Sequence, residues 1–88
     1  MHDPLDPRTR ELVGVAASIV GHCQPCFAYH YGRAIELGVP AEAIRAAMHL
    51  ARAIRASGDQ QMDEFATRRM ESGGAGPNDG FDLGLPKL

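Results

Sequence analysis

The sequence predicts an all-α fold, a short helical bundle that forms one domain. Apolar residues recur at helical spacing through most of the chain, and no segment shows a convincing strand pattern. Proline or a capping residue stands where the periodic segments begin, and glycine follows where they end. The 88 residues suffice for one small core, and 44% hydrophobic with 23% charged residues is a globular composition.

The first helix is expected from Pro7 to about Val20. Asp6 can cap it, proline suits its first position, and Gly21 can end it. Its apolar positions follow the spacing of one helical face: Leu12, Val15, Ala16, Ile19 and Val20. The β-branched residues of this segment would also suit a strand, so a strand is the alternative interpretation.

The second helix is expected from about Pro25 to Leu37, with Gly38 closing it. Apolar or aromatic residues stand on nearly every side, and only Arg33 and Glu36 are clear solvent positions. A helix of this kind needs cover on most of its surface, more than a small four-helix monomer can supply. We therefore expect a homo-oligomer, in which a neighbouring chain covers the rest.

Two further helices are expected after Pro40. The third would end at Ser57 and Gly58, and its buried stripe would be Ile44, Ala47, Met48, Ala51 and Ile54. The fourth would run from Asp59 to about Met70, with one face formed by Met62, Phe65, Ala66 and Arg69. Ser57 and Gln60 also fit a capping box, so the alternative is a single bend between the two helices.

The helical domain is expected to cover residues 1–71, and residues 72–88 form a Gly/Pro-rich tail. The tail is either a frayed terminus or a segment that docks on a neighbouring subunit.

The net charge and the composition limit the classes of partner that the protein is expected to bind. The net charge of −2 and the absence of Trp give no reason to expect nucleic acid. The N-terminus lacks a basic region followed by an apolar run, and the least polar stretch, residues 12–20, is too short to span a membrane. We therefore expect a cytoplasmic protein that does not bind a membrane.

The two cysteines, Cys23 and Cys26, form a CxxC pair at a predicted helix start. In a reducing compartment such a pair is more often redox-active or metal-binding than a static crosslink. Near a helix N-terminus, free N–H groups and the helix dipole favour a thiolate at Cys26. His30 follows four residues later on the same helical face, where an imidazole can accept or return a proton.

A second set of polar residues lies at matching positions of the first helix. Glu11, Ser18 and His22 share one stripe if that helix extends far enough. Two adjacent helices could then bring a carboxylate, an imidazole and two thiols together. Those groups are what thiol-based peroxide reduction requires: a nucleophile, a base and a resolving thiol.

With Glu11 twelve residues before Cys23 and His30 four after Cys26, the chain resembles the alkylhydroperoxidase D-like branch of the carboxymuconolactone decarboxylase superfamily. The resemblance covers about Glu11 to Met70. It implies an all-α trimer or hexamer with thiol peroxidase, peroxiredoxin-like activity. Cys26 matches the cysteine that becomes the sulfenic acid, and Cys23 matches its disulfide partner and proton donor. Glu11 and His30 match the proton-relay carboxylate and histidine.

The sequence departs from the pattern of that family at one important position. Pro25 stands where some members carry another relay histidine, and His22 or Ser18 would be accessory groups. The chain is also shorter than the fuller members, so its core would be completed by assembly. The expected substrate is a hydroperoxide, and the reductant is a dithiol or a protein. Neither a cofactor nor a metal is expected.

Several alternatives remain at this point. The cysteines could be inert thiols or a structural disulfide, and His22, Cys23, Cys26 and His30 could together bind zinc. By analogy with thioredoxin, Cys23 rather than Cys26 could be the attacking thiol. The protein could also be a decarboxylase-like enzyme that does not use thiols, or an assembly module without catalysis.

Overall fold

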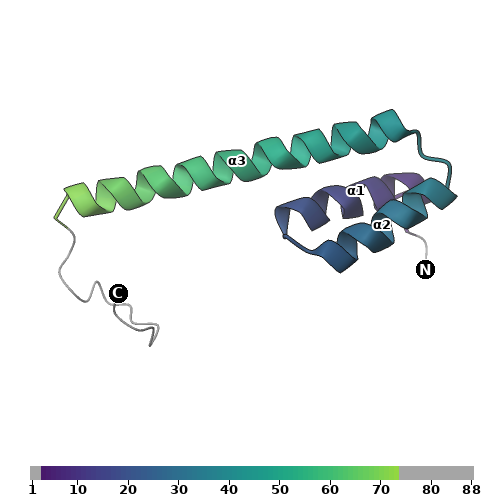
Figure 1. The fold of residues 1–88 in the computed structure, drawn as a ribbon, viewed down its shortest axis with the longest axis horizontal. Helices are drawn as coiled ribbons and strands as arrows, with labels where there is room; N and C mark the ends of the chain where they lie inside the picture. Colours follow the sequence, from purple (N-terminus) through teal and green to yellow (C-terminus); the bar gives the residue numbers. More distant parts are fainter. Residues whose placement is uncertain (1–2, 74–88) are drawn as a thin grey trace. The chain divides into compact units, whose positions relative to one another are not determined.

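The computed structural model describes residues 3–73 and contains three helices in that range. They are α1 (Pro7–Val20), α2 (Gln24–Glu36) and α3 (Ala41–Glu71) (Figure 1). No strand is present in the described range, which confirms the all-α prediction and excludes the strand interpretation of residues 7–20. The chain divides into two units, one ending at Gly58 and one beginning at Asp59.

The start of α1 follows the predicted capping pattern. The Oδ1 atom of Asp6 accepts the backbone N–H groups of Arg8 and Thr9, both at 3.0 Å. Its Oδ2 atom accepts the hydroxyl of Thr9 at 2.7 Å. The Thr9 hydroxyl and N–H groups stabilise the charged carboxylate and so lower the pKa of Asp6.

The turn between α1 and α2 is a Schellman motif with histidine at the left-handed position. His22 has a φ of 56°, and its N–H donates to Ile19 O at 3.3 Å. The N–H of Cys23 donates to Ser18 O at 2.9 Å. Glycine usually occupies this position, because a side chain is strained there. The same turn therefore ends α1 and fixes the backbone of Cys23.

A second Schellman motif ends α2. Gly38 has a φ of +75°, and the N–H of Val39 donates to Ala34 O at 3.0 Å. The Nε of Arg8 donates to Leu37 O at 3.0 Å, which ties the start of α1 to the end of α2. The predicted stop at Gly38 is therefore confirmed, and its cause is the left-handed conformation that glycine adopts without strain.

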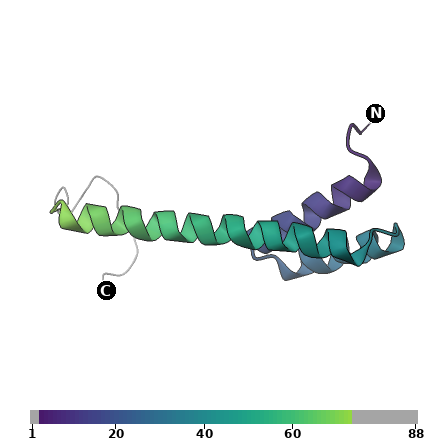
Figure 2. The same cartoon turned by 90° about the horizontal axis from the view of Figure 1, so that it is seen from above.

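In the first unit α1 and α2 form an antiparallel pair, and the first part of α3 lies over it (Figures 1 and 2). The centre of the core is small and consists of Val15, Ala34, Val39 and Ile44. Partly buried side chains pack around it: Leu12, Phe27, Leu37, Ala43 and Met48. This packing fixes the faces of α1 and α2 that carry the polar residues of the site.

The predicted end of one helix at Ser57 and Gly58 and start of another at Asp59 is wrong. Residues 41–71 form one continuous helix. A glycine inside a helix costs about 1 kcal/mol relative to alanine. Ending one helix and starting another would leave several N–H and C=O groups without helical partners. The chain has no proline in this segment to enforce such a break.

The inner face of α3 also differs from the predicted stripe. Ile44 and Ala51 are buried as expected, whereas Ile54 is 55% exposed. Arg55 is half-buried instead, and its Nη1 donates to Ile19 O at 3.3 Å. One helical face contains positions 44, 48, 51 and 55. The inward-facing stripe of α3 therefore continues to an arginine.

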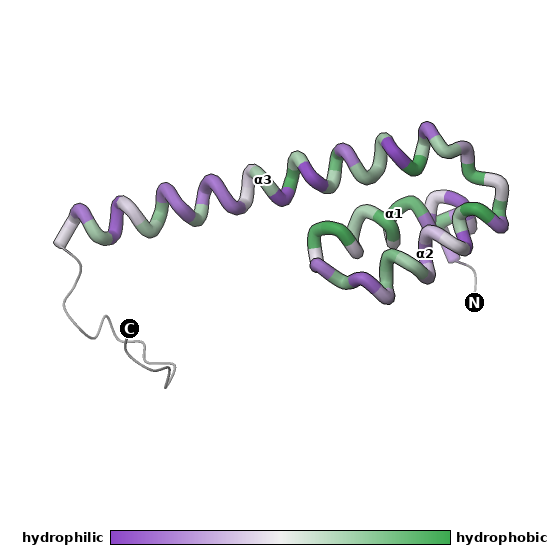
Figure 3. The backbone as a smooth tube through the Cα atoms, viewed as in Figure 1, coloured by the Kyte–Doolittle hydropathy of each residue, from purple (hydrophilic) through white to green (hydrophobic). Residues whose placement is uncertain are grey.

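In the second unit every described residue, from 59 to 73, is exposed. Met62 and Phe65 are 61% and 52% exposed, so the apolar face predicted for this segment has no cover within the described chain. Hydrophobic and hydrophilic residues alternate along α3 (Figure 3). None of the described helices combines the length and the hydropathy that crossing a membrane requires. Most of the predicted tail, residues 74–88, lies outside the described residues.

Candidate functional site

The two cysteines are joined. A disulfide links Cys23 to Cys26 across the first turn of α2. Cys23 is half-buried and Cys26 is exposed. The bond gives the pair a redox form that a reductant can open, and Cys26 is the more exposed of the two residues.

The sulfur of Cys23 caps α2. The helix begins at Gln24, one residue earlier than predicted, so Cys23 is its N-cap residue. Its Sγ accepts the backbone N–H of Cys26 at 3.3 Å. An N–H donor and the positive end of the helix dipole both favour negative charge on this sulfur after reduction.

Glu11 and His30 form a pair between α1 and α2. The Nδ1 atom of His30 lies 3.2 Å from Oε2 and 3.3 Å from Oε1 of Glu11. The Glu11 side chain is 7% exposed and that of His30 is 29% exposed. A carboxylate that accepts from Nδ1 leaves Nε2 as the ring nitrogen able to exchange a proton with another group.

Gly14 makes room for this pair. A Cβ atom at position 14 would overlap the imidazole ring of His30. The ring therefore packs against bare backbone of α1, one turn beyond Glu11. Tyr29 holds it from another side, with the two ring centroids 5.0 Å apart in an edge-on arrangement.

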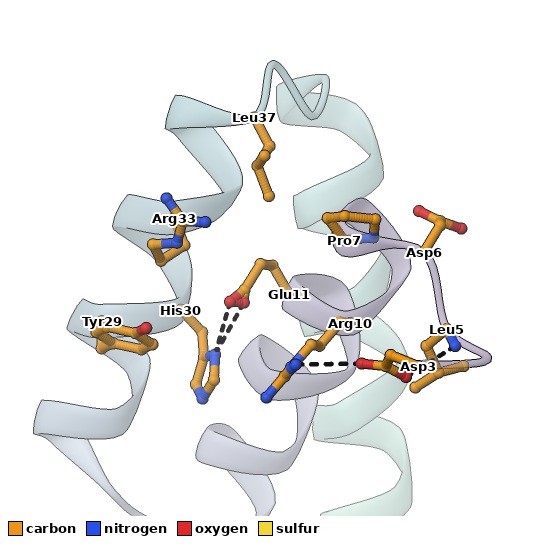
Figure 4. Close-up of a pocket in the computed structure, with 10 residues that line it drawn as sticks. All are labelled: Asp3, Leu5, Asp6, Pro7, Arg10, Glu11, Tyr29, His30, Arg33 and Leu37. Carbon is orange, nitrogen blue, oxygen red and sulfur yellow. Dashed lines mark hydrogen bonds and ion pairs between the residues drawn. The ribbon is translucent and has the colours of Figure 1, made fainter. Parts of the chain in front are cut away.

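The Glu11–His30 pair faces a pocket of about 670 Å³, shown in Figure 4. Neither cysteine lines this pocket. Arg10 and Arg33 contribute to its wall; Arg10 pairs with Asp3 at 3.1 Å, and Arg33 pairs with Glu36 at 2.8 Å. Figure 4 shows the carboxylate of Glu11 and the ring of His30 pointing toward each other between the two helices.

A separate pocket of about 320 Å³, called the disulfide pocket below, lies beside Cys23. Its lining consists of Ser18, Ile19, His22, Cys23, Gln24, Phe27 and Arg55. The lining comes from the end of α1, the turn, the start of α2 and the inner face of α3. The disulfide and the Glu11–His30 pair therefore open into different pockets.

The structure brings together only some of the predicted groups. Glu11 and His30 are paired, and Cys23 and Cys26 are bonded, but no hydrogen bond within residues 3–73 joins His30 to either sulfur. The connection between the two halves of the site is the single helical turn from Cys26 to His30.

The accessory residues differ in their roles. Ser18 is buried. Its hydroxyl donates to Gly14 O at 2.6 Å, so the hydroxyl proton takes part in a hydrogen bond to the backbone. His22 does not continue the stripe of Glu11 and Ser18, because α1 ends at Val20 and the left-handed turn leaves His22 exposed. His22 lines the disulfide pocket instead.

The zinc interpretation has no support in this geometry. Residues 3–73 bring no three His, Cys, Asp or Glu side chains close enough together to hold a metal ion.

A sequence profile of the carboxymuconolactone decarboxylase family matches residues 1–70. The chain belongs to the carboxymuconolactone decarboxylase family. The match covers all three helices apart from the last residue of α3. No curated protein and no solved structure is similar enough to give a match.

For this member of the carboxymuconolactone decarboxylase family, two residues of the site were missing from the sequence prediction. Gly14 interrupts an otherwise periodic helix, and an isolated glycine inside a helix signals close packing. Arg55 lies at the fourth position of the series 44, 48, 51 and 55, but an arginine is ordinarily assigned to the solvent face. Neither residue could be linked to its partner without the packing of the helices.

Proposed function

We propose that this protein is a thiol peroxidase of the alkylhydroperoxidase D-like branch, which reduces hydroperoxides through Cys23 and Cys26. The supporting observation is a disulfide at the N-terminus of α2, one turn before an imidazole held by a buried carboxylate. A nucleophilic thiol, a second thiol and an oriented acid–base group are the requirements of that chemistry.

In the first step, the thiolate of Cys26 attacks the distal oxygen of the hydroperoxide. The O–O bond breaks, the sulfur becomes a sulfenic acid, and the alkoxide leaves as an alcohol after taking a proton. His30 takes the proton from the thiol and returns it to the alkoxide through Nε2. Glu11 orients the ring through Nδ1 and balances the charge of the imidazolium.

In the second step, the thiolate of Cys23 attacks the sulfur of the sulfenic acid. The disulfide forms, and hydroxide leaves as water after taking a proton. The N–H of Cys26 already points at Cys23 Sγ and favours this thiolate. A dithiol then returns two electrons, which restores both thiols as the reductant becomes a disulfide.

The test is hydroperoxide consumption in the presence of a small dithiol, for the wild type, Cys26→Ser and Cys23→Ser. The wild type should turn over. Cys26→Ser should be inactive, and Cys23→Ser treated with peroxide in the absence of the dithiol should form a sulfenic acid without an intramolecular disulfide. Equal consumption by all three proteins would exclude this function.

A second function is favoured by one specific observation, the pocket of about 670 Å³ that contains the Glu11–His30 pair and neither cysteine. A buried carboxylate beside an imidazole, with Arg10 and Arg33 in the same wall, could transfer protons on a small carboxylate substrate. This decarboxylase-like function would survive the double replacement of both cysteines by serine, whereas the peroxidase function would not.

We also propose that copies of the chain assemble into a trimer or hexamer. On α2, Tyr29, Tyr31 and Ile35 are 61%, 42% and 51% exposed, although the core is small. Covering such side chains yields about 25 cal/mol for each Å² of apolar surface. Sedimentation at micromolar concentration should give a multiple of 9.5 kDa, and a stably folded species at 9.5 kDa would refute assembly.

A further inference from the structure

The disulfide pocket contains a positive charge that has no role in the proposed peroxidase steps. Arg55 and Cys23 line this pocket from α3 and from the start of α2. No carboxylate of the described residues lines it. The other titratable group there is His22, which directly precedes Cys23.

Arg55 differs from two other arginines near the site. Arg10 and Arg33 are paired with the carboxylates of Asp3 and Glu36. Arg55 uses one N–H to donate to Ile19 O at 3.3 Å, and within residues 3–73 no carboxylate pairs with it. A half-buried guanidinium has lost part of its hydration, so a nearby negative group would stabilise it.

The reduced form of the protein can supply that negative group. Cys23 Sγ already accepts the N–H of Cys26 at the N-terminus of α2, a position that favours a thiolate. We propose that Arg55 is the counter-charge of the Cys23 thiolate. This role rests on the proposed thiol chemistry and adds a positioning residue to it.

The counter-charge also predicts which sulfur the reductant attacks, and which sulfur leaves, when the disulfide is opened. A thiol reductant attacks one sulfur, and the other sulfur leaves with the electron pair of the S–S bond. The better-stabilised thiolate leaves faster. With Arg55 and the N–H of Cys26 supporting Cys23, the reductant attacks the sulfur of Cys26, the more exposed residue, forms a mixed disulfide there and releases the Cys23 thiolate.

The experiment is a pH titration of thiolate ultraviolet absorbance in a Cys26→Ser background. The chain has two cysteines, so this background leaves Cys23 as the single thiol and keeps the backbone N–H at position 26. Arg55→Met is expected to raise the midpoint pH of thiolate formation by about half a unit to one unit. Arg55→Lys should restore most of the shift.

Two further variants act as controls. Arg52→Met removes an exposed charge from the same helix, outside the disulfide pocket, and should leave the midpoint unchanged. Arg55→Gln removes the charge but keeps an N–H donor for Ile19 O, so it should raise the midpoint as Arg55→Met does. His22→Gln measures the separate contribution of the neighbouring imidazole.

The proposal is overturned if Arg55→Met and Arg55→Gln titrate with the parent midpoint, or if Arg52→Met shifts it equally. The titration contains no peroxide, so it can succeed even if the peroxidase assay fails. An unchanged midpoint together with wild-type peroxide turnover would remove only the role of Arg55.

Discussion

The imidazole of His30 occupies the space where any side chain at Gly14 would lie. This contact allows α1 and α2 to approach closely enough for Nδ1 of His30 to reach the carboxylate of Glu11 at 3.2 Å. The orientation of the Glu11–His30 pair therefore depends on a residue that has no side chain of its own.

Gly14→Ala is expected to destabilise the protein and to slow its reaction with peroxide. Alanine improves helix propensity by about 1 kcal/mol, but inserting a methyl group into a filled space costs about 1–3 kcal/mol. Gly32→Ala is the matched control, because a Cβ there meets no atom within 4 Å, and it should stabilise α2. Thermal unfolding and peroxide kinetics measure both effects. Wild-type behaviour of Gly14→Ala would show that the contact is unimportant.

Glu11→Gln and His30→Gln should each slow the oxidation of the thiol by about 10²-fold, the usual effect of losing a general acid–base group. Glutamine at position 11 can still accept a hydrogen bond from Nδ1, so the fold should persist. Glu42→Gln and His49→Gln change the same residue types at exposed positions of α3 and should leave the rate unchanged. Stopped-flow measurement of the reduced protein with peroxide gives the rates. Wild-type rates for both Glu11→Gln and His30→Gln would exclude the relay.

Local signals were enough to predict the first two helices and the Cys23–Cys26 pair one turn before His30, but not that the disulfide and the Glu11–His30 pair would line different pockets. Asp6 and Gly38 carry cap chemistry that acts over a few residues, and the spacing from Cys26 to His30 lies within one turn. The continuity of α3 at Gly58 was not predictable from such signals. It depends on the free-energy cost of ending one helix and starting another, which a single glycine in the sequence does not reveal. The inward position of Arg55 depends on contacts between α1 and α3, which sequence spacing does not contain.

Gly58→Ala tests the continuity of α3. Gly58 is helical, and a Cβ there would meet no atom within 4 Å. Alanine should therefore increase helicity and stabilise the helix by about 1 kcal/mol. Gly73→Ala is the control with the opposite expectation, because Gly73 has a φ of +82° beyond the helix end. Circular dichroism during thermal unfolding distinguishes them. A loss of helicity in Gly58→Ala would indicate that the helix breaks at this residue.

The N-cap residue of α1 predicts a defined pH dependence of the protein's stability. The hydrogen bonds from Thr9 lower the pKa of Asp6 in the folded protein. The unfolded chain then binds more protons in acid, so the contribution of Asp6 is complete above the usual carboxyl range and is lost as the pH falls through the lowered pKa. Asp6→Asn, which can still cap but cannot ionise, should show a weaker acid dependence of the melting temperature. Asp63→Asn, at an exposed position of α3, should melt like the wild type across the same range.

In the proposed function, Cys23 and Cys26 act as one redox pair toward peroxide. The direct measurement is mass spectrometry with thiol counting, after the fully reduced protein has received one equivalent of hydroperoxide. Both thiols should disappear together, the chain should lose two hydrogen atoms without gaining oxygen, and a dithiol should restore the reduced protein. A stable sulfinic acid on one cysteine without an intramolecular disulfide, or two thiols that remain unreacted, would contradict the proposed function.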